Sequence, residues 1–229
     1  MDNYQKFGIF AIVISIPFTV ASFFNQGQGV IFAIGILYGL IFIFHSRIEK
    51  DIISKIKKPL VFYGVFVFLS GMFIESLAYF NNLVKIKAGQ DVFLFSPDLI
   101  TDLFIKGLPH YILIAIFLSL LVRKYYFSVF ELGFILWLFW AVVVDNFSHL
   151  QALLTGNILD FTMAGLLMVF GLHWPILVFR DSLDEAYPKR SRHWFKYPAA
   201  FISLILSVVV LTVLVFLIEE KIGLVNSGR

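Results

Sequence analysis

Acidic and histidine side chains inside apolar segments are the residues of this chain best suited to do chemistry. Glu75 lies in the apolar stretch Gly71-Met-Phe-Ile-Glu75, roughly 7–8 Å from the end of the predicted helix. A charge at the centre of a bilayer costs about 2.5–3.5 kcal/mol on insertion scales, so it needs a specific reason. Two interpretations are open: a neutral glutamic acid that hydrogen-bonds another helix, or a ligand for a proton, a metal ion or a substrate.

Asp145 and His149 are four residues apart and would share one face of a helix. This spacing can hold a metal ion or orient a histidine for acid–base catalysis, and it is also common in hydrogen-bonded pairs at helix ends. The chain contains no cysteine, but carboxylates and imidazoles suffice for zinc or another divalent ion. We therefore predict Glu75, Asp145 and His149 as catalytic residues and as candidate metal ligands.

Three further polar residues fall near the same end of the predicted helices, and we expect them to bind substrate: Asp102, His110 and Asp160. Structural roles are open for them as well. Asp102 can pair with Lys106 one turn further on, and Asp160 can occupy the first turn of a helix capped by Asn157.

The segment Asp145-Asn-Phe-Ser-His149-Leu-Gln151, followed by Thr155-Gly156 and Asp160, resembles the outer-facing motif of VanZ-like membrane proteins. The resemblance covers only this short stretch, and several polar positions of that motif are missing. We assign no family from it.

Composition excludes most other classes of protein. Of the 229 residues, 60% are hydrophobic and 14% are charged, whereas soluble domains have about 45–50% and about 25%. A soluble globule could not cover this much apolar surface, and without cysteine there is no disulfide framework. The net charge of +3 fits basic loops at a membrane better than a nucleic-acid partner, so we expect membrane lipids as partners and no nucleic acid.

We predict an all-α, multi-pass helical bundle of about seven transmembrane helices, forming a single domain over residues 1–229. Continuous apolar runs exclude a membrane β-barrel. The first run is longer than the usual core of a signal peptide, so we expect it to be retained as a helix. The predicted spans are 7–24, 30–46, 60–80, 99–122, 128–147, 158–179 and 198–218.

Most of the 18 Lys and Arg residues fall in the segments before residue 7 and within 47–58, 123–127 and 180–197. Because cytoplasmic loops are enriched in these residues, the N-terminus is expected inside and the C-terminus outside. In a prokaryote this places the chain in the cytoplasmic membrane. The candidate site residues then face the outer leaflet.

The segment 97–106 is expected to form a short interfacial helix. Ser96 is a good N-cap, Pro97 suits the first helical position and Asp98 suits the first turn. Gly107 and Pro109 are then expected to bend the chain into the next span. A single long kinked helix is the alternative.

Three classes of function fit these observations. The first is a membrane-embedded, metal-dependent or metal-free enzyme acting on a lipid or lipid-linked substrate from the outer leaflet. The second is an ion- or proton-coupled transporter or channel, and the third is a non-catalytic subunit of a membrane complex. A polar cluster confined to one leaflet favours the enzyme, because a site on one side needs no pathway across the membrane. The sequence leaves the oligomeric state open.

Overall fold

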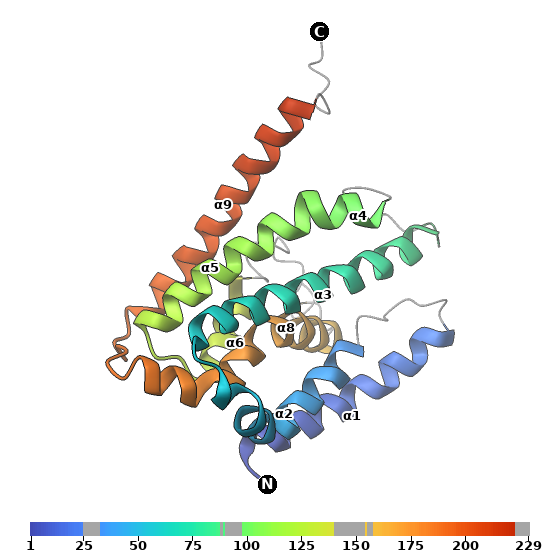
Figure 1. The fold of residues 1–229 in the computed structure, drawn as a ribbon. Coiled ribbons are helices and arrows are strands. Elements are labelled where there is room, and N and C mark those ends of the chain that lie inside the picture. Colours follow the sequence, from blue (N-terminus) through green and yellow to red (C-terminus); the bar gives the residue numbers. More distant parts are fainter. Residues whose placement is uncertain (25–32, 88, 90–97, 140–153, 155–157, 223–229) are drawn as a thin grey trace.

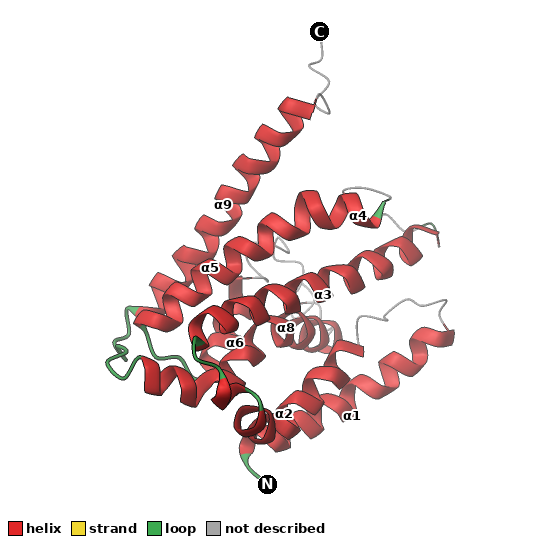
Figure 2. Ribbon diagram, in the orientation of Figure 1, coloured by secondary structure: helices red, strands yellow, loops and turns green. Residues whose placement is uncertain are grey.

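The computed structural model describes residues 1–24, 33–87, 89, 98–139, 154 and 158–222. Within these ranges the regular structure is helical, apart from one isolated bridge between Tyr125 and Ser191 (Figure 2). The helices are α1 (Asn3–Phe24), α2 (Ala33–Asp51), α3 (Pro59–Lys87), α4 (Leu99–Asp102), α5 (Leu108–Lys124), α6 (Val129–Phe139), α8 (Ile158–Ala186) and α9 (Lys196–Ile222). Two short turns of other helix types are η2 (Ile53–Lys55) and η3 (Leu103–Gly107).

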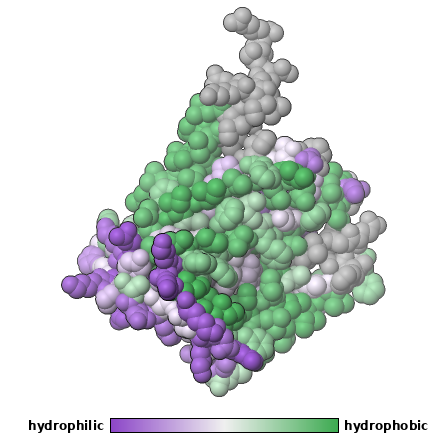
Figure 3. Space-filling view, viewed as in Figure 1, coloured by the Kyte–Doolittle hydropathy of each residue, from purple (hydrophilic) through white to green (hydrophobic). Residues whose placement is uncertain are grey.

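Three of the described helices are long and apolar enough to cross a membrane. Their apolar parts are Asn3–Ala21, Pro59–Val84 and Lys196–Leu214, and α6 is a shorter apolar helix. The space-filling view agrees, because hydrophobic residues cover most of the visible surface and hydrophilic residues gather at one end (Figure 3). The chain is therefore a helical membrane protein.

The helices pack as a bundle around α3 and α8. Helix α3 contacts both α5 and α8, α1 packs on α2, and α2 and α6 contact α8. Helix α9 contacts α5 and α6, and its distal half extends away from the bundle (Figure 1). Large aromatic side chains fill the interior, including the fully buried Tyr38, Phe42, Tyr63, Phe139 and Phe179.

Helices α1 and α2 approach closely at a pair of glycines. A β-carbon on Gly8 would lie 2.5 Å from the carbonyl oxygen of Gly39. No larger residue fits there without moving the backbone. Small residues at such a contact are typical of helix pairs in membranes, where packing rather than water exclusion drives association.

The start of α4 differs from the sequence prediction. The N-cap is Asp98, not Ser96, and its side chain accepts a hydrogen bond from the backbone N–H of Thr101 at 2.8 Å. Leu103 and Gly107 both have right-handed helical backbone angles. The chain therefore continues helically from Leu99 to Lys124, and the long-helix alternative is closer to the structure than an interfacial helix ended by a bend.

Several helices extend beyond the predicted spans, α3 and α8 by the most residues at their C-terminal ends. Helix α3 continues to Lys87 and α8 to Ala186, because polar residues at their ends remain compatible with helix although they are unsuited to lipid. Of the predicted span 128–147, the structure describes the part up to Phe139 as α6.

Candidate functional site

Glu75 lies on α3 and meets α5 through a hydrogen bond. The hydroxyl of Tyr111 donates to its Oε2 at 3.1 Å. Tyr111 is fully buried, whereas Glu75 is partly accessible. The phenol therefore holds the carboxyl group of Glu75 from its buried side.

The apolar part of the helix that carries Glu75 is longer than the sequence predicted. The apolar part of α3 runs to Val84, nine residues beyond Glu75, which corresponds to about 14 Å along the helix. A carboxyl group in the middle of an apolar helix is costly wherever that helix crosses a bilayer.

Gly71 makes the contact between Tyr111 and α3 possible. A β-carbon at this position would lie 2.0 Å from Cδ1 of the Tyr111 ring. The ring thus packs directly on the backbone of α3, one helical turn before Glu75. Sequence reasoning missed Tyr111, because no pattern in the sequence links a tyrosine of one apolar helix to an acid on another.

A π-helical turn lies beside Glu75. Residues Leu103–Gly107 form this turn, and a β-carbon on Gly107 would lie 3.4 Å from Cγ of Glu75. Single π-turns inside α-helices are rare and occur frequently at functional sites, because they widen the helix and redirect its side chains. Here the turn brings the backbone of the α4–α5 segment against the carboxyl-bearing side chain.

His110 adjoins this site. It is partly buried, and its ring meets that of Tyr111 edge-on, with 5.0 Å between the ring centres. One of the predicted substrate-binding residues therefore lies next to the Glu75–Tyr111 pair in the structure.

The remaining predicted residues are placed only in part. Asp102 is the last residue of α4, and Asp160 lies in the first turn of α8. For these two residues the structure describes the backbone only. Asp145 and His149 lie outside the described residues. Among the side chains that the structure describes, no group of three His, Asp or Glu residues could hold a metal ion.

A second polar contact lies in the interior of the bundle. The indole N–H of Trp174 on α8 donates to the hydroxyl of Ser70 on α3 at 2.8 Å. Tyr38 of α2 stacks on Trp174 with 6.3 Å between ring centres. All three side chains are buried, so three helices meet around a small polar core next to Gly71.

Paired charges gather where the loops between α5 and α6 and between α8 and α9 meet, and we name this part of the bundle the charged end. The ammonium group of Lys196 lies 2.7 Å from Glu131, whose other oxygen accepts the backbone N–H of Ser128 at 2.7 Å. Glu131 and Ser128 thus form a capping box at the start of α6. The guanidinium of Arg190 pairs with Asp184 and also donates to the carbonyl of Val122 at 3.2 Å. Both cationic side chains are almost completely buried.

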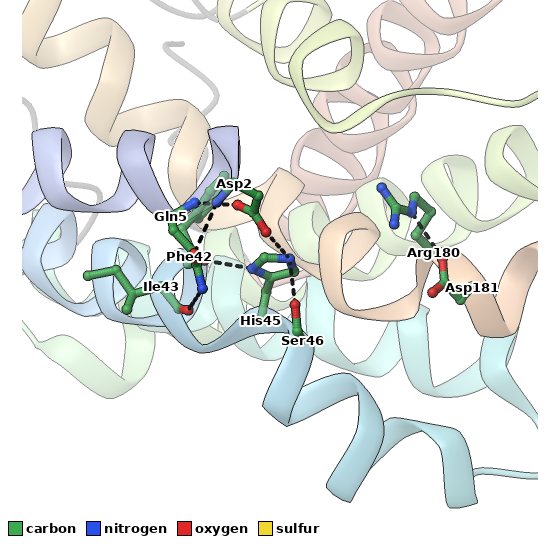
Figure 4. Close-up of polar contacts among 8 residues, drawn as sticks. All are labelled: Asp2, Gln5, Phe42, Ile43, His45, Ser46, Arg180 and Asp181. Atoms are coloured by element: carbon green, nitrogen blue, oxygen red, sulfur yellow. Dashed lines mark hydrogen bonds and ion pairs between the residues drawn. The ribbon is translucent and has the colours of Figure 1, made fainter.

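A polar pocket of about 390 Å³ lies between the ends of α2 and α8 and is lined by His45, Ser46, Glu49, Lys50, Ser54, Arg180, Asp181, Ser182 and Glu185. Figure 4 shows His45 beside Asp2, with 3.5 Å between Nε2 and the carboxylate. Since the Phe42 carbonyl can only accept, His45 donates to it through Nδ1 at 2.8 Å. Glu49 accepts the backbone N–H of Asp181 at 3.0 Å, and burial raises the pKa of its carboxyl group.

The chain matches no protein-family model, and comparisons with curated proteins and with solved structures found no match. The resemblance of 145–160 to VanZ-like proteins therefore assigns no family. Function has to be argued from the residues themselves.

Proposed function

We propose that this membrane protein is an enzyme that acts on a lipid or lipid-linked substrate, with Glu75 at the centre of its site. The observation that carries the proposal is the Glu75–Tyr111 pair, which lies deep in an apolar helix beside a π-turn. Helix packing alone does not account for an acid at this depth, since interhelical hydrogen bonds contribute only about 0.6 kcal/mol on average.

The chemistry proposed for this pair is acid–base catalysis. A carboxyl group held by a phenol can accept a proton from a hydroxyl group of the substrate and return it to a leaving group. Tyr111 is the positioning residue, because its hydroxyl fixes Oε2 of Glu75 at 3.1 Å. His110, partly buried beside Tyr111, would contact the polar head of the substrate.

Asp145 and His149 complete the proposed catalytic group, together with a divalent ion such as zinc bound to Glu75. Such an ion would supply an activated water by lowering its pKa. Asp102 and Asp160 are proposed to bind substrate. The arrangement requires the predicted seven spans, with the N-terminus inside, so that all these residues reach the outer leaflet.

Elemental analysis and lipid turnover test this proposal together. The purified chain is analysed for bound metal and is then reconstituted with a total lipid extract, whose composition is followed by mass spectrometry. We expect Glu75→Gln and His149→Ala each to abolish turnover and to lose the bound metal. Asp181→Asn is the matched control, because it removes one carboxylate charge at the other end of the bundle. Full turnover by both site variants would contradict the assignment.

A proton-coupled transporter is the second candidate. It is favoured by the buried contact of Ser70 with Trp174 and by the neighbouring Tyr38, because these groups place hydroxyls in the interior between the two ends of the bundle. Proton flux into liposomes that disappears in Glu75→Gln, without any change in lipid composition, would support the transporter over the enzyme.

A further inference from the structure

Two loops join at the charged end of the bundle to form one surface. The backbone N–H of Tyr126 donates to the carbonyl of Ser191 at 2.9 Å, and the N–H of Ser191 donates to the carbonyl of Lys124 at 2.9 Å. The end of α5 is thereby fixed to the loop between α8 and α9 (Figure 1). The surface includes four exposed cations and one exposed aromatic residue, and we name it the basic loop surface: Arg123, Lys124, Lys189, Arg192 and Trp194.

The cations of these loops fall into two groups. Arg190 and Lys196 are buried and neutralised by Asp184 and Glu131, so they serve the internal structure. By contrast, the four cations of the basic loop surface are exposed and form no ion pair with a carboxylate of the described residues. Their positive charge is therefore available to an external anion.

One of these cations is held in place by an aromatic ring. The guanidinium carbon of Arg192 lies 4.6 Å from the centre of the Tyr126 ring. A guanidinium that stacks on a ring in this way keeps its N–H donors free at the edge, where they match the geometry of a phosphate group. The stacking also reduces the conformational entropy lost when an anion binds.

The neighbouring aromatic residues place this surface at the membrane boundary. Trp194 is 66% exposed and Phe195 is 50% exposed, and both directly precede Lys196, where the apolar part of α9 begins. Tryptophan at the end of a membrane-crossing helix typically lies at the level of the lipid head groups. The exposed cations are therefore at the depth of lipid phosphates.

We propose that the basic loop surface binds the phosphate groups of anionic phospholipids in the adjacent leaflet. This proposal does not depend on the function proposed for Glu75. The other basic segment, 47–58, is a weaker candidate for the same role. It contains no aromatic residue, and its Arg47 lies 3.4 Å from Asp51, one turn away on α2.

Lipid titration of the full chain in a neutral detergent tests the proposal. Phosphatidylglycerol or phosphatidylcholine is added, and bound lipid is counted by native mass spectrometry. The variant Lys124→Gln/Arg192→Gln removes two cations of the surface. The control Lys55→Gln/Lys57→Gln removes two exposed cations of the segment 47–58. Circular dichroism and size-exclusion chromatography establish that each variant is folded.

We expect the native chain to prefer phosphatidylglycerol. Each cation near a lipid surface contributes about 1 kcal/mol, so its removal should weaken binding about fivefold and the double variant about 25-fold. The control should stay within about twofold of the native chain. Trp194→Ala, which leaves every charge in place, should weaken binding of the same lipid several-fold and serves if the double variant fails to fold.

Three results would overturn the proposal. Equal binding of the two lipids would mean that the surface does not recognise anionic lipid. Equal losses in the double variant and the control would mean that only the overall charge matters. Displacement of phosphatidylglycerol by an equal concentration of inorganic phosphate would assign the surface to a free anion instead of a lipid.

Discussion

Two sites in the bundle hold their carboxyl groups in different ways. At the charged end, Glu131 receives a buried ammonium group and a backbone N–H. At the other site, Glu75 receives the neutral hydroxyl of Tyr111. A carboxylate that compensates a buried cation is needed for folding, because removing it leaves an unpaired charge. The contact of Glu75 is with a neutral hydroxyl on another helix, and we propose that its carboxyl group serves function rather than stability.

The strongest test of this contrast removes the carboxylate from the charged end. We expect Glu131→Ala to lower the free energy of unfolding by about 3 kcal/mol, because Lys196 would stay buried without its partner. Unfolding is followed by titration with sodium dodecyl sulfate in mixed micelles. Tyr197→Phe is the control, since it removes a hydroxyl that also donates to Glu131 but leaves the ion pair, and it should change stability far less. A loss below about 1 kcal/mol for Glu131→Ala would remove the structural half of the comparison.

Crowding the Glu75 site should give the next largest effect. In Gly71→Ala the new β-carbon overlaps the buried ring of Tyr111, and overpacking of this kind typically costs about 1–3 kcal/mol. The displaced ring would also release Glu75, so any activity should fall together with stability. Gly64→Ala is a comparable substitution earlier on α3, where the atom nearest to the new β-carbon is the hydroxyl oxygen of Ser119 at 2.8 Å, and it should spare the activity. Loss of activity in both variants would mean that the Tyr111 contact is not specific to the site.

The polar core between the two ends should be less sensitive. Ser70→Ala removes the acceptor of the Trp174 indole N–H, and one hydrogen bond is worth about 1 kcal/mol. The Trp174 fluorescence spectrum should shift as its N–H loses this partner. In the double variant Ser70→Ala/Trp174→Phe no donor is left unpaired. Trp174→Phe should therefore destabilise the Ser70→Ala variant less than it destabilises the native chain. Fully additive losses would show that the two side chains do not interact.

The smallest effect concerns the helix start that precedes the π-turn. The Thr101 hydroxyl and backbone N–H both donate to Asp98 and lower the pKa of its carboxyl group below 3.8. Because the pKa is lower in the folded chain, the cap is fully present above about pH 4 and is lost as the pH falls through the folded-state pKa. The protection factor of the Thr101 amide compares its exchange rate with that of an unstructured peptide at the same pH. This factor should therefore fall as the pH drops below about 4. In Asp98→Asn, which caps without titrating, that pH dependence should disappear; its persistence would exclude Asp98 as the cause.

The helical membrane class was predictable from the sequence because it follows from composition and from the length of the apolar runs. Helix starts were less predictable, since Ser96 and Asp98 are both good N-caps and local preference does not choose between them. The continuous helix from Leu99 to Lys124 was predicted only as the alternative to a short interfacial helix. Gly107 and Pro109 were expected to bend the chain, but Gly107 has helical backbone angles and lies close to Glu75.

The candidate site could be predicted in part. Glu75 stands out from sequence alone because an acid in an apolar run is costly. Tyr111 does not, because a tyrosine in an apolar helix has no periodic or charge signal, and only the fold brings it to Glu75. The charged end is similar: Lys196 and Glu131 are 65 residues apart, so the basic residues predicted orientation but not which of them would be buried in pairs.

The central claim is that Glu75 serves function and Glu131 serves structure, and one measurement tests it without knowledge of the substrate. Glu75→Gln and Glu131→Gln are unfolded side by side in the same mixed micelles. We predict that Glu131→Gln loses about 2 kcal/mol, because the charge opposite Lys196 is gone. Glu75→Gln should change stability by less than about 1 kcal/mol, because an amide oxygen still accepts from the phenol. Equal losses in the two variants, or a larger loss for Glu75→Gln, would contradict the account.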